Sequence, residues 1–88
     1  MKVQNIKNAN GRAVPNQFIL TSTGGMRWFQ SYESMIAMIT ASGQVSLDKT
    51  YWDYSKTTGK YRNQFLGESK KETQAKIDSG EYVLTDLN

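Results

Sequence analysis

The sequence predicts a single small α+β domain over residues 1–88, in which an antiparallel sheet packs against about three helices. Three observations support this fold class. The chain of 88 residues is long enough for one modest core. Short β-rich runs separated by turn residues alternate with segments that carry helix start and stop signals. Hydrophobic residues make up 38% and charged residues 22% of the chain, which is typical of a globular domain.

Residues 17–30 predict a β-hairpin. Two β-rich runs flank Gly24-Gly25, and a Gly-Gly pair readily adopts the primed turns that match the twist of paired strands. Because neighbouring residues of a strand point to opposite faces, only one of Trp28 and Phe29 can face the core. The other is a candidate contact residue.

Three further segments have strand character. Residues 2–8 are weakly β-like, and the Asn10-Gly11 pair that follows fits either a loose hairpin or an ordered loop. The alternating pattern near residues 45–48 predicts a short strand. Residues 81–85 predict a last strand, which we expect beside another strand because a lone terminal strand would fray.

Residues 32–42 predict the first helix, packed on the sheet. Ser31 precedes this segment as a candidate N-cap, and Gly43 follows it as a candidate C′ residue. Four apolar residues recur at the spacing of one helical face: Tyr32, Met35, Ile36 and Ile39.

Two more helices are expected, at residues 57–66 and 70–79. The earlier one has Ser55 or Thr57 as its N-cap and Gly67 as its stop. The later one begins with Ser69-Lys70-Lys71-Glu72, the Ser-x-x-Glu pattern of a reciprocal capping box, and ends before Gly80.

The net charge of +3 is unevenly distributed along the chain. Residues 1–32 carry a charge of +4, residues 33–48 carry −2, residues 49–62 carry +3, and residues 63–88 carry −2. Two basic segments therefore alternate with two acidic ones. This pattern suits an anionic partner, such as phosphate, nucleic acid or an acidic protein face, and it also fits an ordinary mixed surface.

The absence of histidine and cysteine excludes several chemistries. A zinc site with His or Cys ligands and a Ser-His or Cys-His nucleophile pair are both ruled out. No acidic pair stands in a recognisable catalytic motif, so we expect a non-enzymatic protein with no catalytic residue, metal or cofactor. The sequence contains no apolar run of membrane-spanning length and no signal-peptide pattern, and we therefore expect a cytoplasmic protein.

Residues 51–67 hold the candidate binding site. The proposed contact residues for protein or nucleic acid combine aromatic and cationic side chains: Tyr51, Trp52, Tyr54, Lys56, Lys60 and Arg62, together with Arg27 from the hairpin. Thr57, Thr58 and Gly59 form a candidate anion site, because the free amides of a helix start favour phosphate or carboxylate. The alternative is structural: Ser55 and Thr57 cap the helix while the aromatic residues complete the core.

Three linked motifs resemble a family of small, uncharacterised proteins of phages and prophages. They are Phe29-Gln30-Ser31-Tyr32 with Ile36-Ala37, then Tyr54-Ser55-Lys56-Thr57-Thr58-Gly59-Lys60-Tyr61, and then Phe65-Leu66. The resemblance covers roughly residues 16–67 and extends to residues 86–88. Many relatives have His where this chain has Tyr61, so a role for that His does not carry over.

The resemblance implies a phage accessory protein that acts by binding. The expected function is binding and inhibition of a host defence factor, with anti-CRISPR activity as the most specific version. The expected partner is a host protein or ribonucleoprotein in the host cytoplasm. The alternative is a small nucleic-acid-binding protein that uses the basic and aromatic segment 51–62.

Overall fold

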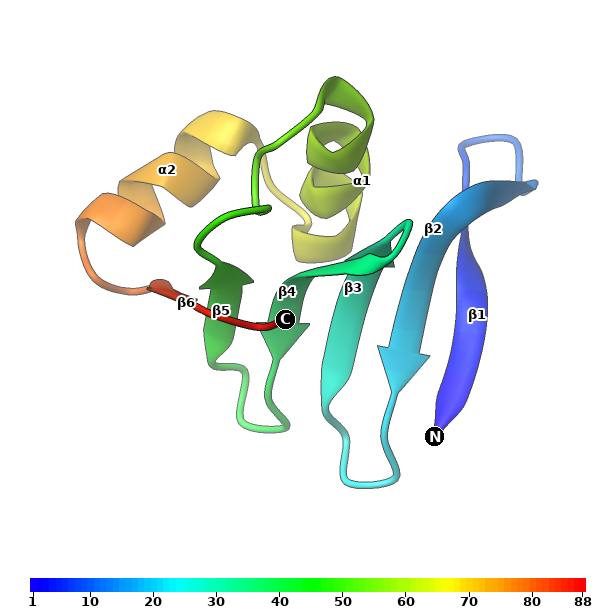
Figure 1. Ribbon diagram of the computed structural model, residues 1–88, viewed down its shortest axis with the longest axis horizontal. Helices are drawn as coiled ribbons and strands as arrows, with labels where there is room; N and C mark the ends of the chain where they lie inside the picture. The colour runs from blue at the N-terminus through cyan, green and yellow to red at the C-terminus, as the bar shows by residue number, and fades with distance from the viewer.

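All six strands belong to one sheet, and their spatial order follows the chain, β1-β2-β3-β4-β5-β6, in the computed structural model (Figure 1), which describes residues 1–88. The strands are β1 (Lys2–Lys7), β2 (Ala13–Thr21), β3 (Arg27–Ser31), β4 (Ser34–Ile39), β5 (Val45–Asp48) and β6 (Val83–Thr85). Two helices, α1 (Lys56–Leu66) and α2 (Lys70–Asp78), lie between β5 and β6 in the sequence. The small α+β domain with a mostly antiparallel sheet is therefore confirmed.

The hairpin predicted at residues 17–30 is formed by β2 and β3. Their turn contains Gly25 with a φ of 89°, a left-handed conformation that glycine adopts without a steric penalty. Phe29 faces the core and is fully buried, whereas Trp28 lies on the opposite face and is half-buried. The sequence had left open which of the two faces inward.

The helix predicted at residues 32–42 is wrong, and the molecule has two helices rather than three. Residues Ser34–Ile39 instead form β4, which pairs with β3 on one side and with β5 on the other. A bulge opposite Phe29 and Gln30 turns both Ile36 and Ala37 inward, so the buried residues do not alternate as in a regular strand. Pairing on both sides outweighs the local helical spacing.

The two predicted ends of that helix have other roles. Ser31 is buried in β3, where its hydroxyl lies 2.9 Å from the Thr58 hydroxyl, so it caps no helix. Gly43, with a φ of 94°, lies in the turn between β4 and β5, where the Gly43 amide donates to the Thr40 carbonyl. Ser31 therefore belongs to a strand, and Gly43 to the turn between two strands.

The two ends of the chain complete the edges of the sheet. The Asn10-Gly11 segment is a hairpin turn, in which the Asn8 side chain accepts hydrogen bonds from the Asn10 and Arg12 amides and β1 pairs with β2. The final strand is confirmed but shorter than expected, and it pairs in parallel with β5. The sheet is therefore not purely antiparallel.

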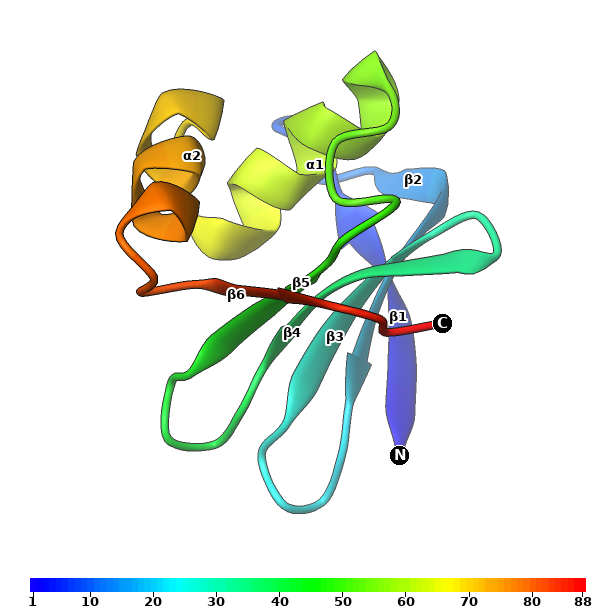
Figure 2. The same ribbon diagram turned by 60° about the vertical axis from the view of Figure 1, so that its left-hand side comes forward.

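The two remaining helices are confirmed with their caps. The Ser55 side chain accepts from the Thr58 amide at the start of α1, and Gly67 ends α1 in the left-handed conformation. At the start of α2 both bonds of the Ser69–Glu72 capping box are present. The two helices lie on the same side of the sheet (Figure 2). Neither is long and apolar enough to cross a membrane.

The core lies between α1 and the covered face of the sheet. Phe29 packs against Phe65 of α1 with ring centroids 5.9 Å apart. Nine buried hydrophobic residues form one cluster: Ile6, Phe29, Ile36, Ala37, Val45, Leu47, Tyr61, Phe65 and Tyr82. Because α1 is fixed on β3 and β4 by this core, its N-terminal end is held beside the loop that follows β5.

Candidate functional site

The loop of residues 49–55 that leads into α1 is shaped by one buried carboxylate. Asp48 accepts hydrogen bonds from the backbone amides of Thr50 (3.1 Å), Tyr51 (2.8 Å) and Leu87 (2.8 Å). Burial alone would raise the pKa of Asp48, but these hydrogen bonds outweigh it and lower the pKa below its ordinary value. The carboxylate thus fixes the start of the loop and ties it to the C-terminal segment.

Arg62 of α1 reaches into the same loop. Its Nη1 donates to the Trp52 carbonyl (2.8 Å) and to Asp53 Oδ1 (3.0 Å), and its Nη2 donates to Asn63 Oδ1 (2.9 Å). The guanidinium also lies 5.1 Å from the centre of the Trp52 ring, within the range of a cation–π contact. The side chain is only 1% exposed, so Arg62 holds the loop in place in addition to lining the surface.

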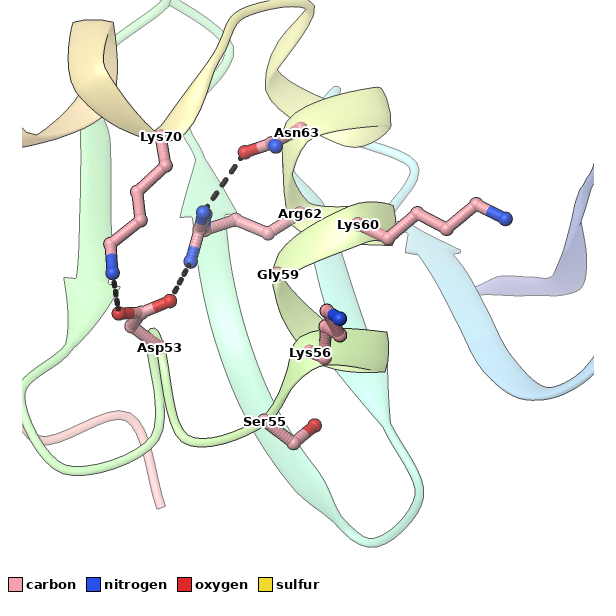
Figure 3. Close-up of a pocket in the computed structure, with 8 residues that line it drawn as sticks. All are labelled: Asp53, Ser55, Lys56, Gly59, Lys60, Arg62, Asn63 and Lys70. Atoms are coloured by element: carbon pink, nitrogen blue, oxygen red, sulfur yellow. Dashed lines mark hydrogen bonds and ion pairs between the residues drawn. The ribbon is translucent and has the colours of Figure 1, made fainter.

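Asp53 joins the two helices through a pair of cations. Besides Arg62, it contacts the Nζ atom of Lys70, at the start of α2, over 2.7 Å. Partial burial would raise the pKa of Asp53, but hydrogen bonds and charge interactions from Lys70 and Arg62 outweigh it and hold the pKa below its ordinary value. Asp53 is therefore an ionised group engaged on both oxygens (Figure 3).

The predicted anion-site residues Thr57, Thr58 and Gly59 lie in the first turn of α1, but they differ in accessibility. Thr58 is fully buried and its hydroxyl contacts the hydroxyls of Ser31 and Ser55. Thr57 is exposed, and its amide makes no hydrogen bond within the chain. Gly59 is half-buried beside Asp53 and Arg62. Of these three residues, Thr57 is therefore the exposed one at the start of α1.

A polar cleft of about 650 Å³ opens between the loop and the starts of the two helices (Figure 3). We refer to it as the basic cleft. No hydrophobic side chain lines it, and its residues are Asp53, Ser55, Lys56, Gly59, Lys60, Arg62, Asn63 and Lys70. Four cations and one carboxylate give this lining a formal charge of 4 − 1 = +3. The chain thus concentrates its positive charge where two helices begin.

The cations of the basic cleft are not equivalent. Arg62 and Lys70 are paired with Asp53, whereas Lys56 and Lys60 make no ion pair. Lys60 extends away from the Asp53–Arg62 pair in Figure 3, and its Nζ atom lies 5.3 Å from the Tyr61 ring centre. Lys56 is therefore the unpaired cation beside the first turn, and Lys60 contributes charge at the edge.

The predicted aromatic residues of the loop differ in their exposure to solvent. Tyr51 and Tyr54 are 36% and 46% exposed and form an edge-to-face pair with ring centroids 5.6 Å apart. Trp52 is half-buried beneath Arg62 and packs against the core. Only the two tyrosines of this loop present open ring surface to a partner.

Arg27 is separate from the basic cleft. Its guanidinium lies 5.4 Å above the Phe65 ring, one residue before α1 ends, whereas the cleft lies at the beginning of that helix. Thr58 and Phe65 are seven residues apart, which corresponds to about 10 Å along a helix. The structure therefore brings together the predicted residues of segment 51–62 and leaves Arg27 outside.

Sequence reasoning missed Asn63 and Lys70 as members of the site, and did not assign Asp53 its role as the link between helices. The capping box at Ser69 placed Lys70 in the first turn of a helix, which was the one available signal. That this turn lies beside Asp53 follows from tertiary packing, which no local pattern reveals.

The model of a family of unknown function (DUF8033) matches residues 1–81. This match spans the whole sheet apart from β6, both helices and every residue of the basic cleft. No curated protein and no solved structure matches the chain.

Proposed function

Because the chain belongs to the family of unknown function DUF8033, its membership assigns it no activity, and we propose from the site alone that it is a non-enzymatic protein that binds the phosphate groups of single-stranded nucleic acid. The observation that carries the proposal is the basic cleft, where unpaired cations gather at the start of α1 beside the start of α2.

Lysines at the starts of both helices support an anionic ligand. The N-terminal end of a helix carries a partial positive charge, so cations there weaken the helix by a few tenths to about 1 kcal/mol. Nevertheless α1 begins with Lys56 and has no acidic residue in its first turn, whereas in α2 the cations Lys70-Lys71 share the first turn with Glu72. A phosphate bound in the cleft beside Lys56 would offset the repulsion between this lysine and the start of α1.

The tyrosine pair favours single-stranded nucleic acid among phosphate-bearing ligands. Tyr51 and Tyr54 belong to the same loop as Asp53 and Ser55 of the cleft, and their rings are exposed. Unpaired bases stack on exposed aromatic rings, with about 1–3 kcal/mol per base in known single-strand binders. A strand whose phosphates occupy the cleft therefore finds a stacking surface in the adjoining loop.

The state of Asp53 favours binding over catalysis. A general base works best when its pKa lies near the working pH. Asp53 is the only acid of the cleft, and the pKa of its carboxyl is held below the ordinary value by two cations. Its oxygens are engaged in holding Arg62 and Lys70, which suits a structural role in a binding site.

The direct test is fluorescence anisotropy with a labelled single-stranded oligonucleotide at low salt. We expect the wild-type chain to bind, and the triple variant Lys56→Gln, Lys60→Gln, Lys70→Gln to lose at least tenfold in affinity. Arg62 is kept because its removal would disturb the loop. Duplex of the same sequence is compared in parallel, and we expect it to bind more weakly because its bases are not free to stack.

A matched control removes the same charge elsewhere. Lys2→Gln, Lys7→Gln, Arg12→Gln lowers the net charge by three at β1 and the turn that follows it. At about 0.1 M salt, where the Debye length is about 10 Å, we expect this variant to bind within about twofold of the wild type, since attraction between remote charges is largely screened. Equal losses in both triple variants, or no binding by the wild type at low salt, would refute the proposed site.

A second candidate function is inhibition of a host defence factor in the host cytoplasm, with anti-CRISPR activity as its most specific form. The resemblance to phage proteins suggests it, and the exposed tyrosine pair favours it, because tyrosine is enriched at protein interfaces. A pull-down from host lysate with and without nuclease separates the two candidates. Recovery of one host protein after nuclease treatment would support inhibition, and loss of the captured material would support nucleic-acid binding.

A further inference from the structure

The face of the sheet opposite the helices carries a continuous apolar surface. Paired residues of neighbouring strands share a face, and the register places Val3 beside Leu20, Leu20 beside Trp28, and Trp28 beside Met38. A second row on this face pairs Phe18 with Gln30 and Gln30 with Met35. We call the six apolar residues of these rows the open face: Val3, Phe18, Leu20, Trp28, Met35 and Met38.

No part of the hydrophobic core covers the open face. Neither the core cluster nor the partly buried residues packed against it include any of its six members. Both helices lie on the other side of the sheet (Figure 2). Val3 is 60% exposed and the five larger side chains are half-buried, with the C-terminal Asn88 bonded to the backbone of Met35 at one edge. Contiguous apolar patches of this kind mark interaction surfaces.

The two rows of the open face carry no charge, and Asp48, which lies on the same face of β5, is buried and accepts hydrogen bonds from the Thr50, Tyr51 and Leu87 amides. In a chain with 11 cations and 8 acids, the two rows contain only apolar side chains and neutral polar ones such as Asn5 and Gln30. The neighbouring pair Thr21 and Arg27 points to the opposite face of the sheet, which the helices cover. Interfaces between identical subunits are more apolar and poorer in charge than transient ones, and they are enriched in Trp, Phe and Met.

We propose that the open face packs against the open face of a second copy of this chain. A twofold axis through the sheet would bring the Leu20–Trp28–Met38 row of one protomer against the same row of its partner, as in an aligned β-sandwich. Because the two apolar rows are uncharged, two chains that each carry +3 bury no like charges between these rows.

The size of the open face fits a weak contact. Four strands spaced by about 4.8 Å, each about five residues long, cover roughly 19 Å by 17 Å, or about 320 Å² in projection. The contact therefore lies at the low end of interface sizes, as expected for a dimer that dissociates on dilution.

The dimer has a consequence for the basic cleft. With the sheets in contact, the helices form the two outer layers, and each protomer presents its cleft on its outer side. Two clefts on one particle can engage one long strand at two places, which raises the apparent affinity without any new contact. The dimer itself does not depend on nucleic-acid binding.

Sedimentation of the wild-type chain over a range of micromolar concentrations tests the proposal. We expect a particle of twice the mass of one chain that dissociates on dilution. Trp28→Lys and Met38→Lys place a charge on the open face, and each should sediment as a monomer with an unchanged circular dichroism spectrum. Ala75→Lys adds the same charge on the exposed surface of α2 and should remain dimeric.

A second measurement avoids surface variants altogether. In Trp52→Phe, Trp28 is the only tryptophan, and we expect its emission to shift to the red on dilution as the ring becomes hydrated. A wild-type monomer at every concentration, a dimer that persists in both lysine variants, or a Trp28 emission that is independent of concentration would overturn the proposal. The Lys56→Gln, Lys60→Gln, Lys70→Gln variant should remain dimeric, so failure of nucleic-acid binding and failure of dimerisation are separate results.

Discussion

Replacing Arg62 by methionine should destabilise the fold by about 3 kcal/mol. The change removes a charge-assisted hydrogen bond to Asp53, worth about 1.5–3 kcal/mol, and leaves the Trp52 carbonyl without its donor, at about 1–3 kcal/mol. Asp53 keeps Lys70 and is 29% exposed, so hydration limits its share of the loss. Methionine also removes the buried Nε of Arg62, which has no partner, and this reduces the total.

Urea unfolding and thermal unfolding, both followed by circular dichroism, measure this difference. For a domain of this size, 1 kcal/mol corresponds to about 4–8 °C in melting temperature, so we expect Arg62→Met to melt roughly 12–24 °C below the wild type. Lys60→Met is the matched control, because it removes the same charge from the same helix at an exposed site. Its cost should stay below about 1 kcal/mol, the size of an exposed cation–π contact.

Two results would refute this reasoning. If Arg62→Met unfolds at the same urea concentration as the wild type, the two hydrogen bonds to Trp52 and Asp53 do not anchor the loop. If Lys60→Met costs as much as Arg62→Met, the loss reflects the general charge of the helix rather than the contacts of Arg62.

Three further predictions concern buried polar groups. Gln17→Met should raise the free energy of unfolding by about 1–2 kcal/mol, because both polar atoms of this buried side chain lack partners; a lower urea midpoint would contradict this. Thr58→Val should cost about 1–2 kcal/mol in the same assay by leaving the Ser31 hydroxyl unpaired, and a neutral result would show that this contact contributes nothing. Because the folded pKa of Asp48 is lowered, its stabilisation is present above the unfolded pKa of about 4 and is lost as the pH falls through the folded value. Asp48→Asn should therefore be less stable at pH 7 and lose less stability on acidification, and parallel melting curves against pH would exclude that role.

The parts of the fold that local chemistry specifies were predictable from the sequence. Ser55 and Gly67 bound α1 as expected, and the Ser69–Glu72 capping box starts α2, because a cap depends on residues only three positions apart. The Gly24-Gly25 turn likewise formed between the two strands of the expected hairpin. Such signals act within one turn of chain and need no tertiary partner.

Strand β4 shows what local patterns could not provide. In Ser34–Ile39 the apolar residues match a helical face, and only the neighbouring strands and a bulge at Ile36 make this segment a strand. Pairing with β3 and β5 depends on the strands that flank this segment and not on the spacing within it, so the spacing alone pointed to the wrong element. The error also hid the open face, because Met35 and Met38 were assigned to a core helix.

The sequence predicted where the candidate site lies, but not the contacts that hold its residues together. Lys56, the tyrosines and the start of α1 were recognised, since they lie in one short segment. The roles of Asp53 and Lys70 required the packing of α2 against the loop, and the burial of Arg62 depends on Trp52 beneath it. No sequence pattern distinguishes a buried cation from an exposed one at adjacent turns of a helix.

The salt dependence of single-strand binding tests the central claim most directly. Each phosphate neutralised by the protein contributes about −0.7 to the slope of log Kobs against log salt concentration for a single strand. If the cleft neutralises three phosphates through Lys56, Lys60 and Lys70, the slope of the wild type should be steeper by about 2 than that of the variant with glutamine at all three positions. The control variant changed at Lys2, Lys7 and Arg12 should match the wild-type slope. Equal slopes for the wild type and the cleft variant would contradict the account.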